Sequence, residues 1–226
     1  MKFTSFPKCF FWLLAAAIIL ITSFLYWPQP KMGFVLDDHY VIEQNSVIKN
    51  PALYPKILSA KLFAAAHHAS ESTLNYYRPI LMASFALDYK LWGLNAFGYR
   101  MVNIGLHALN SVLVFILLFL LFENRRLAAV ASIYFCILPV HEWVVRYIVG
   151  RGDLLECFFT LVSLTTLLLY FQKTTKPWLM LSLAAFLAAL LCREVAILNA
   201  VNVFMISYYR TRDFKKTVKI FSLFFN

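Results

Sequence analysis

Residues 99–122 read YRMVNIGLHALNSVLVFILLFLLF. This stretch decides the fold class, because a run of about 20 mostly apolar residues is long enough to cross a bilayer as a helix. Further apolar runs flank it at residues 9–27, 127–147, 154–171, 178–192 and 195–209, the last two being short. We therefore predict an all-α, polytopic membrane helix bundle with about six spans.

Composition supports a membrane protein. Of the 226 residues, 62% are apolar and 14% charged, whereas a soluble domain carries about 25% charged residues. One soluble core cannot hide that much apolar surface, so the sequence predicts a single domain over residues 1–226 embedded in lipid. A cleaved signal peptide is the alternative for the first run, but the run is longer than the usual apolar region and no small-x-small site follows it.

Basic residues are distributed in a way that predicts orientation. The net charge is +10, and nucleic-acid binding would need a basic face on a soluble fold. Instead, 11 of the 21 Lys and Arg fall in segments 1–8, 123–126, 172–177 and 210–219. Because short cytoplasmic loops collect Lys and Arg, we expect the N-terminus to be cytoplasmic. Residues 28–98 then form an extracytoplasmic loop, in which the apolar segment Pro79–Leu94 is expected to be an interfacial helix.

Ionisable residues near a membrane core are costly and therefore informative. Asp37 and Asp38 stand side by side among apolar residues shortly after the first run. One of them could act as a general base, its pKa raised by its neighbour and by partial burial; a solvated acidic turn is the alternative. The four cysteines contain no CxxC pair, so neither zinc nor redox chemistry is indicated.

A polar stripe lies on the second predicted span. Arg100, Asn103, His107 and Asn110 are spaced by three, four and three residues, which places them within an arc of roughly 80° on one helix face. This face must meet protein or water rather than lipid. A functional site and hydrogen bonding between helices both remain open for it.

Two turns on the same predicted side carry further charges. Glu142 stands four residues before Arg146, which suits an ion pair, and the preceding Pro139 can kink the helix. Arg151 and Asp153 follow at the mouth of the next span, where interfacial charge is the alternative reading.

The turn between the last two runs, Arg193-Glu194, lies on that side as well. A guanidinium there can bind a phosphate through two hydrogen bonds, although a plain polar turn is the alternative. Carboxylates and arginines gathered at one membrane face suit transfer of a group from a lipid-linked phosphate donor, so we expect Asp37, Arg151 and Asp153 to converge.

The order of these segments resembles the transmembrane and tetratricopeptide-repeat O-mannosyltransferases and their bacterial relatives, in the GT-C glycosyltransferase superfamily. The matching stretches are Leu36-Asp-Asp-His39, Tyr77-Arg-Pro79, Gly98-Tyr-Arg-Met-Val-Asn103 with His107, Leu138-Pro-Val-His141-Glu142, and Val149-Gly-Arg-Gly-Asp-Leu-Leu155, with Arg193-Glu194 in place of a Lys-Glu turn. Arg100 stands where the family has His. The family has more spans and a C-terminal repeat domain, so we expect a fragment, in which Ile220–Asn226 resembles the start of another span.

The resemblance implies transfer of a sugar, typically mannose, from a polyprenyl-phosphate carrier to a protein hydroxyl. It implies that Asp37 is the base, that Asp38 assists it, and that Arg78, Arg151 and Arg193 contact the donor phosphate. The other polar residues of the matching stretches would line the substrate site: Arg100, Asn103, His107, His141, Glu142, Asp153 and Glu194. Arginines, or a divalent metal on Asp37 and Asp38, would stabilise the departing charge, and the sequence does not decide between them.

Two other classes of function remain open. A transporter component would use the polar stripe of the second span to line a pathway, and a non-catalytic assembly subunit would need no site. The compact chain favours a bacterial inner membrane. The expected partners are a lipid-linked sugar donor, a protein acceptor and the membrane, with no nucleic acid.

Overall fold

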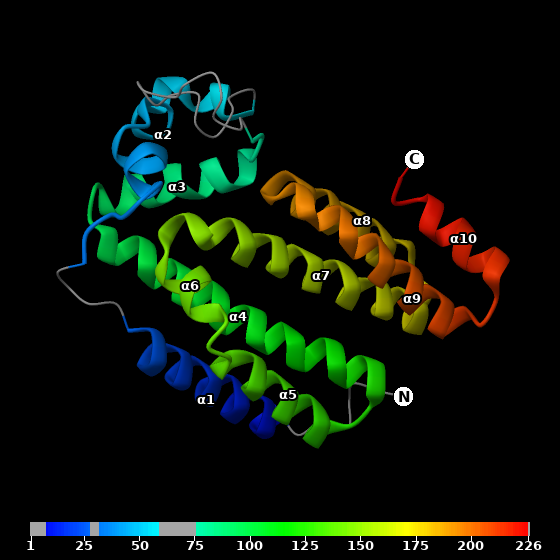
Figure 1. Cartoon of the computed structure of the whole chain (residues 1–226). Helices are drawn as coiled ribbons and strands as arrows, with labels where there is room; N and C mark the ends of the chain where they lie inside the picture. The colour runs from blue at the N-terminus through cyan, green and yellow to red at the C-terminus, as the bar shows by residue number, and fades with distance from the viewer. Residues whose placement is uncertain (1–7, 28–31, 59–75, 226) are drawn as a thin grey trace.

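The computed structural model describes residues 8–27, 32–58 and 76–225, and within them all regular structure is helical. The body of the molecule consists of α1 (Lys8–Tyr26), α4 (Ala96–Phe122), α5 (Arg125–Ile137), α7 (Arg151–Lys173) and α8 (Lys176–Cys192). These helices run side by side, with α4 packed against α1, α5 and α7, and α8 packed along α7 (Figure 1). α9 (Asn199–Thr211) packs against α7, and α10 (Phe214–Ser222) against α9.

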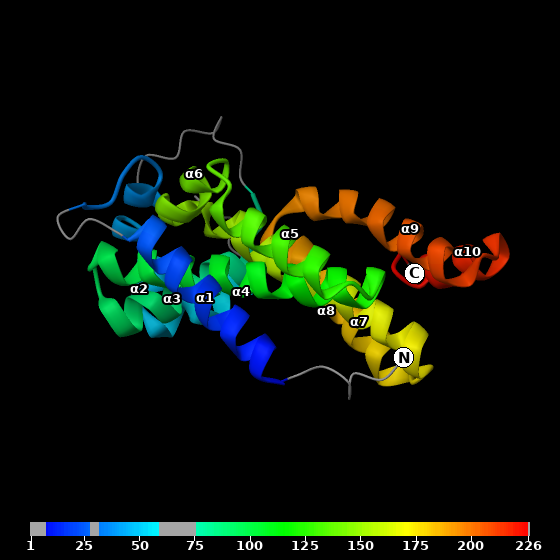
Figure 2. The ribbon, with the colours of Figure 1, turned by 90° about the horizontal axis from the view of Figure 1, so that it is seen from below.

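Short elements form a cap at one end of the bundle. They are the π-helical turn η2 (His39–Glu43), α2 (Ser46–Lys49), the 3-10 segment η3 (Pro51–Leu58) and α3 (Pro79–Trp92). α6 (His141–Arg146) lies at the same end, as the two views agree (Figures 1 and 2). The cap and α6 therefore surround the point where α7 begins. The predicted interfacial helix exists as α3, and whether it lies outside the cytoplasm stays a prediction.

Local sequence explains where several helices begin. The side chain of Asn95 accepts a hydrogen bond from the backbone N–H of Phe97, at the start of α4. Asn124 does the same for Arg126 and Leu127, at the start of α5. Asparagine is favoured at this position because its oxygen satisfies N–H groups that lack a partner within the helix.

Three helices in the described residues are long and apolar enough to cross a membrane: Cys9–Tyr26, Ala96–Phe122 and Ile148–Lys173. Lys176–Cys192 is apolar but shorter. The predicted all-α membrane class is therefore confirmed, and the chain is an integral membrane protein. The number of six spans stays a prediction, because the third and sixth predicted spans are not single long helices.

The third predicted span, residues 127–147, is divided near Pro139. α5 ends at Ile137, Leu138 is extended with φ −60° and ψ 123°, and α6 begins at His141. A residue that precedes proline disfavours helical geometry, and proline itself has no N–H to donate. The break turns residues 138–150 out of the bundle axis. The sixth predicted span is likewise divided, into the 3-10 segment η5 (Glu194–Leu198) and α9.

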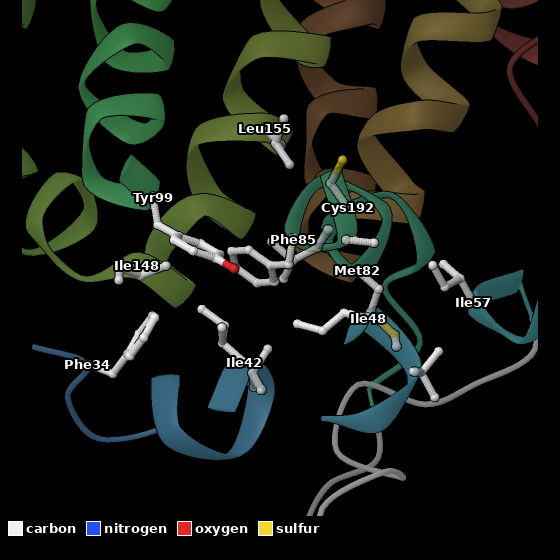
Figure 3. Close-up of a cluster of buried hydrophobic side chains, with 14 of the residues drawn as sticks. Phe34, Ile42, Ile48, Ile57, Met82, Phe85, Tyr99, Ile148, Leu155 and Cys192 are labelled. Carbon is white, nitrogen blue, oxygen red and sulfur yellow. The ribbon is translucent and has the colours of Figure 1, made fainter. Parts of the chain in front are cut away.

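The cap is attached to the bundle by an apolar core. Figure 3 shows side chains from the cap, such as Ile42, Ile48 and Met82, pointing toward Tyr99 of α4 and Leu155 of α7. Burial of such side chains stabilises the folded chain by about 1.5–3 kcal/mol each relative to exposure. This core holds the loop that carries Asp37 and Asp38 against the beginning of α7.

Candidate functional site

The two adjacent aspartates face different surroundings. Asp37 is exposed, whereas the side chain of Asp38 is fully buried. Each oxygen of Asp38 accepts a hydrogen bond from a backbone N–H at 3.1 Å: Oδ2 from Val35 and Oδ1 from Val149. The second bond joins the aspartate loop directly to the turn before α7 through Asp38, while the expected convergence of Asp37 with Arg151 and Asp153 stays a prediction.

Burial changes the acidity of Asp38. It raises the pKa of this carboxyl from 3.8 to about 6, because a charged carboxylate loses its water. The two N–H groups, and the positive charge of Arg100, lower the pKa only in part. Asp38 is thus a carboxyl group that changes protonation near neutral pH.

Asp37 meets Tyr147. Burial raises the pKa of the Tyr147 hydroxyl above its usual value of 10, and the negative charge of Asp37 and a hydrogen bond with it raise this pKa further. The phenol therefore keeps its proton and donates a hydrogen bond to the Asp37 carboxylate. This bond fixes the direction of an otherwise solvent-facing carboxylate, which is what a general base needs.

A pocket of about 410 Å³ opens beside Asp37 and its partner Tyr147. Its walls come from the chain after α1 and from the segment around α6: Met32, Val35, Pro139, Val140, Glu142, Trp143, Arg146 and Tyr147. Glu142 and Arg146 form the predicted ion pair, 3.3 Å apart and part-exposed. The pocket is therefore mostly apolar with one pair of charges, and Trp143 in its wall is exposed.

Four of the expected substrate-binding residues form a second cluster. Arg78 binds both oxygens of Glu194, with Nη2 2.8 Å from Oε1 and Nε 3.3 Å from Oε2. Arg193, the next residue in the chain, forms an ion pair with Asp153 of α7. Arg193 and Glu194 keep about a third and a half of their side-chain surface exposed, so this cluster remains accessible to an anion.

Arg151, the first residue of α7, is buried. Its side chain has no exposed surface, and its Nη1 lies 2.6 Å from Oδ2 of Asp88 in α3. Its Nε donates to Oδ1 of Asn103 and its Nη2 to the carbonyl of Tyr99, each at 2.8 Å. The expected contact of Arg151 with a donor phosphate does not fit this burial. Instead, Arg151 ties together α3, α4 and α7.

The polar stripe of α4 faces the bundle interior, as predicted. Arg100, Asn103, His107 and Asn110 are all buried. Asn103 donates to the carbonyl groups of Val145, Tyr147 and Ile148, at 3.1–3.3 Å.

Other members of the stripe make the same kind of bond. Arg100 binds the carbonyls of Met32, Gly33 and Arg146, and Asn110 binds that of Leu154. These bonds shape the turns on which the aspartate loop rests. The stripe therefore joins chain segments and does not line an open pathway in the described residues.

His141 also packs inward. Its ring lies 4.9 Å from that of His107 and 4.5 Å from that of Phe135. Nε2 of His107 lies 3.1 Å from the carbonyl oxygen of Cys136. His107 and His141 thus pack against each other and against the end of α5, beside the break that precedes α6.

The residues present do not fit a metal shared by Asp37 and Asp38. Both oxygens of Asp38 already accept backbone hydrogen bonds inside the protein, while Asp37 faces outward. In the described part of the chain, no group of three or more His, Cys, Asp or Glu side chains could hold a metal ion.

Three residues were missed by sequence reasoning. Asp88 lies within the apolar segment Pro79–Leu94 and was not singled out, Tyr147 stood only as the end of a predicted span, and Glu156 was not singled out either. A signal did exist for Glu156, because it is an acid inside the apolar run that became α7. For Asp88, the sequence could not say which cation it would meet.

Comparison with known proteins agrees with the motifs. Protein O-mannosyl-transferase TMTC3 of Mus musculus is 30% identical over 187 residues, covering 80% of this chain and 20% of the relative. Protein O-mannosyl-transferase TMTC1 of Homo sapiens is 32% identical over 198 residues, covering 81% and 22%. The chain is a homologue of the protein O-mannosyl-transferases. Its resemblance to this GT-C family is confirmed by whole-segment identity as well as by the quoted motifs.

Further relatives extend the range of animals. Protein O-mannosyl-transferase Tmtc1 of Drosophila melanogaster is 30% identical over 178 residues, covering 76% of this chain. This O-mannosyl-transferase homologue spans about a fifth of the length of the curated relatives it matches. No family model and no solved structure matches the chain.

Proposed function

We propose that this chain is membrane machinery for transferring a mannose-like sugar from a polyprenyl-phosphate carrier to a hydroxyl group of a protein. The observation that carries the proposal is the hydrogen bond from Val149 to Asp38, which joins the aspartate loop to the turn before α7. Through this bond, the loop that carries the exposed carboxylate of Asp37 is held against the turn that contains Val149 and leads into α7. The printed names of the relatives support mannosyl transfer to proteins.

The proposed reaction is a single displacement at the anomeric carbon. The acceptor hydroxyl attacks this carbon while Asp37 takes its proton, and the bond to the phosphate oxygen breaks. The departing lipid phosphate is already charged, so the step needs no general acid. Tyr147 orients Asp37 through a hydrogen bond donated by its hydroxyl group. Asp38 fixes the backbone of the loop by accepting hydrogen bonds from two backbone N–H groups.

Arg78 and Arg193 are the proposed phosphate-binding residues. Each is part of an ion pair, with Glu194 and with Asp153 respectively. The Arg193–Asp153 pair is part-exposed, and because exposed ion pairs stabilise a protein by only about 0–1 kcal/mol, a phosphate can share or displace Asp153 at low cost. Arg78 is only 11% exposed and adds positive charge beside Arg193. Val149, which donates to Asp38, lies in the 3-10 turn that leads into α7, and Asp153, which pairs with Arg193, is four residues further along the chain. This short connection supports one donor headgroup shared by the aspartate loop and the arginine cluster.

The substitution Asp37→Asn tests the role of the base. The reaction would use the purified chain in lipid nanodiscs, polyprenyl-phosphate mannose, and an acceptor peptide rich in Ser and Thr. We expect Asp37→Asn to lower transfer at least 100-fold, since loss of a general base typically costs 10²–10⁴-fold. Glu123→Gln, which removes one carboxylate at the opposite end of α4, is the matched control. Full transfer by Asp37→Asn would overturn the proposal.

The orientation in the membrane is part of the proposal. The charge distribution supports a cytoplasmic N-terminus and an extracytoplasmic site, and the bacterial inner membrane stays a prediction. In a cysteine-free background, Glu142→Cys should react with an impermeant thiol reagent from outside the cell, and Arg126→Cys should react only after permeabilisation. Reaction of Arg126→Cys in intact cells would reverse this topology.

A further inference from the structure

A carboxylate lies inside the apolar length of α7. Glu156 belongs to the segment Ile148–Lys173, one of the helices long enough to cross a membrane. Its side chain is only half-buried. A charged side chain at the centre of a membrane span costs about 2.5–3.5 kcal/mol on insertion scales. Such residues face the bundle interior or a water-filled space, and Glu156 points to a polar site between α7 and α9.

The partners of Glu156 are neutral. Its Oε1 accepts hydrogen bonds from Nδ2 of Asn199 at 2.6 Å and from the hydroxyl of Thr160 at 3.0 Å. Asn202, one turn further along α9 and exposed, donates its Nδ2–H to Oδ1 of Asn199 at 3.0 Å. One amide and one hydroxyl thus bind a single oxygen of the carboxylate, and the second amide, that of Asn202, supports the first.

No Lys, Arg or His forms an ion pair with Glu156 anywhere in residues 8–27, 32–58 and 76–225. Elsewhere in the described chain, four acids each pair with an arginine, namely Asp88, Glu142, Asp153 and Glu194, so Glu156 differs from them in having only neutral partners. Glu156 instead keeps Oε2 for another hydrogen-bond donor. Hydrogen bonding between helices needs only neutral side chains such as Asn or Thr, so it does not explain a carboxylate here.

The position of Glu156 relative to the arginine cluster suggests the ligand. Asp153 and Glu156 are three residues apart, so they lie on one face of α7, with a rise of about 4.5 Å between them. Asp153 pairs with Arg193, and Asn199, which binds Glu156, follows Arg193 by six residues. Guanidinium groups therefore lie one helical turn from a set of hydroxyl-binding groups. That spacing is comparable with the separation between the phosphate and the far hydroxyls of a hexose phosphate.

We propose that Glu156, Asn199 and Asn202 form the subsite that binds the sugar hydroxyls of the lipid-linked donor. This inference rests on the proposed function and assigns residues to the recognition of the sugar. Oε2 of Glu156, to which no side chain of the described residues donates, accepts a hydrogen bond from a sugar hydroxyl. The exposed amide of Asn202 donates a hydrogen bond to a neighbouring hydroxyl or accepts one from it. A carboxylate beside amides can form hydrogen bonds with both hydroxyl groups of a vicinal diol. An apolar lining offers no such bonds, so it could not distinguish a lipid phosphate that carries a hexose from one that does not.

The test compares two lipids that differ only in the sugar. The wild-type chain and the variant Glu156→Gln, each in nanodiscs, would be titrated with polyprenyl-phosphate mannose and with polyprenyl phosphate alone. We expect Glu156→Gln to weaken binding of the sugar-bearing lipid roughly 10-fold or more, because a hydrogen bond to a charged group contributes about 1.5–3 kcal/mol. Binding of polyprenyl phosphate should not change. Asn202→Ala should show the same selectivity with a smaller loss.

Two controls separate this subsite from other effects. Arg193→Gln should weaken binding of both lipids, since it acts on the shared phosphate, and Glu123→Gln should weaken neither. Equal losses for both lipids in Glu156→Gln, or no loss, would overturn the sugar subsite while leaving the proposed function in place. A wild-type chain that binds neither lipid would overturn the proposed donor class itself, and with it the subsite.

Discussion

Removal of Asp88 should destabilise the chain more than removal of any exposed charge. Asp88 is the ion-pair partner of Arg151 at 2.6 Å, and the two side chains are 6% and 0% exposed. Asp88→Ala leaves a buried guanidinium with its charge uncompensated, which costs about 3–5 kcal/mol. Arg151 keeps its hydrogen bonds from Nε to Asn103 and from Nη2 to the Tyr99 carbonyl, but these supply no negative charge, and Nη1 loses Asp88.

The assay is thermal unfolding of the purified protein in nanodiscs. For a chain of this size, 1 kcal/mol corresponds to roughly 2–4 °C, so the midpoint should fall by about 6–20 °C. Glu142→Ala is the control, because it breaks an arginine–carboxylate pair whose side chains are 61% and 34% exposed. Such a pair contributes about 0–1 kcal/mol.

A double variant makes the reasoning sharper. Asp88→Leu with Arg151→Met removes both charges, so we expect it to be more stable than Asp88→Ala alone, since replacement of a buried pair by apolar side chains is often tolerated. The reasoning would be refuted if Asp88→Ala and Glu142→Ala lowered the midpoint equally. It would also be refuted if the fall in midpoint of the double variant equalled the sum of the falls measured for Asp88→Leu and Arg151→Met separately.

Three further predictions concern the aspartate loop and the polar stripe. Because burial raises the pKa of Asp38 from 3.8 to about 6, the folded state binds this proton more tightly, and up to about 3 kcal/mol of stability present below pH 4 should be lost as the pH rises through 6. Midpoints measured from pH 4 to 7.5 should show this slope in the wild type, and an equal slope in Asp38→Asn would contradict it. Gly150→Ala places a Cβ 2.6 Å from the carbonyl oxygen of Val144 and should cost about 1–3 kcal/mol, whereas Gly105→Ala meets nothing within 4 Å and should stabilise α4 by up to about 1 kcal/mol; chemical denaturation of both variants checks the difference in sign. Asn103→Leu removes the hydrogen-bond donor to the carbonyl groups of Val145, Tyr147 and Ile148 and should lower the free energy of unfolding by about 2 kcal/mol or more. An unfolding midpoint unchanged from that of the wild type would count against the bonds described for the stripe.

The helical class and the inward face of α4 could be read from the sequence. Both follow from local regularities: a long apolar run needs a bilayer, and polar residues at spacings of three and four must share one helix face. The break at Pro139 was also foreseeable as a kink, because proline acts on its own neighbours. What periodicity cannot give is the partner of each buried group, and this is why Arg151 was expected to meet a phosphate and instead meets Asp88.

The candidate site was predicted in part. The expected convergence of Asp37 with Arg151 and Asp153 stays a prediction, and the sequence could not say which of the two aspartates would contact the turn before α7. Their roles differ because one carboxyl is covered by the turn at Val149 and the other is not, which is a result of packing. Glu156 was overlooked for the opposite reason, since a single acid in a strongly apolar run hardly changes its average hydropathy.

The stripe on α4 binds main-chain carbonyls, and every amino acid carries a carbonyl group. Arg100 holds the carbonyls of Met32 and Gly33 whatever side chains stand there, and Asn103 does the same at Val145 and Ile148. Mutational tolerance should therefore be uneven across these contacts. In a saturation library, positions 32 and 33 should accept many substitutions while position 100 accepts few. Selection should therefore conserve the side chains of α4 more strongly than the side chains of the loops that α4 binds.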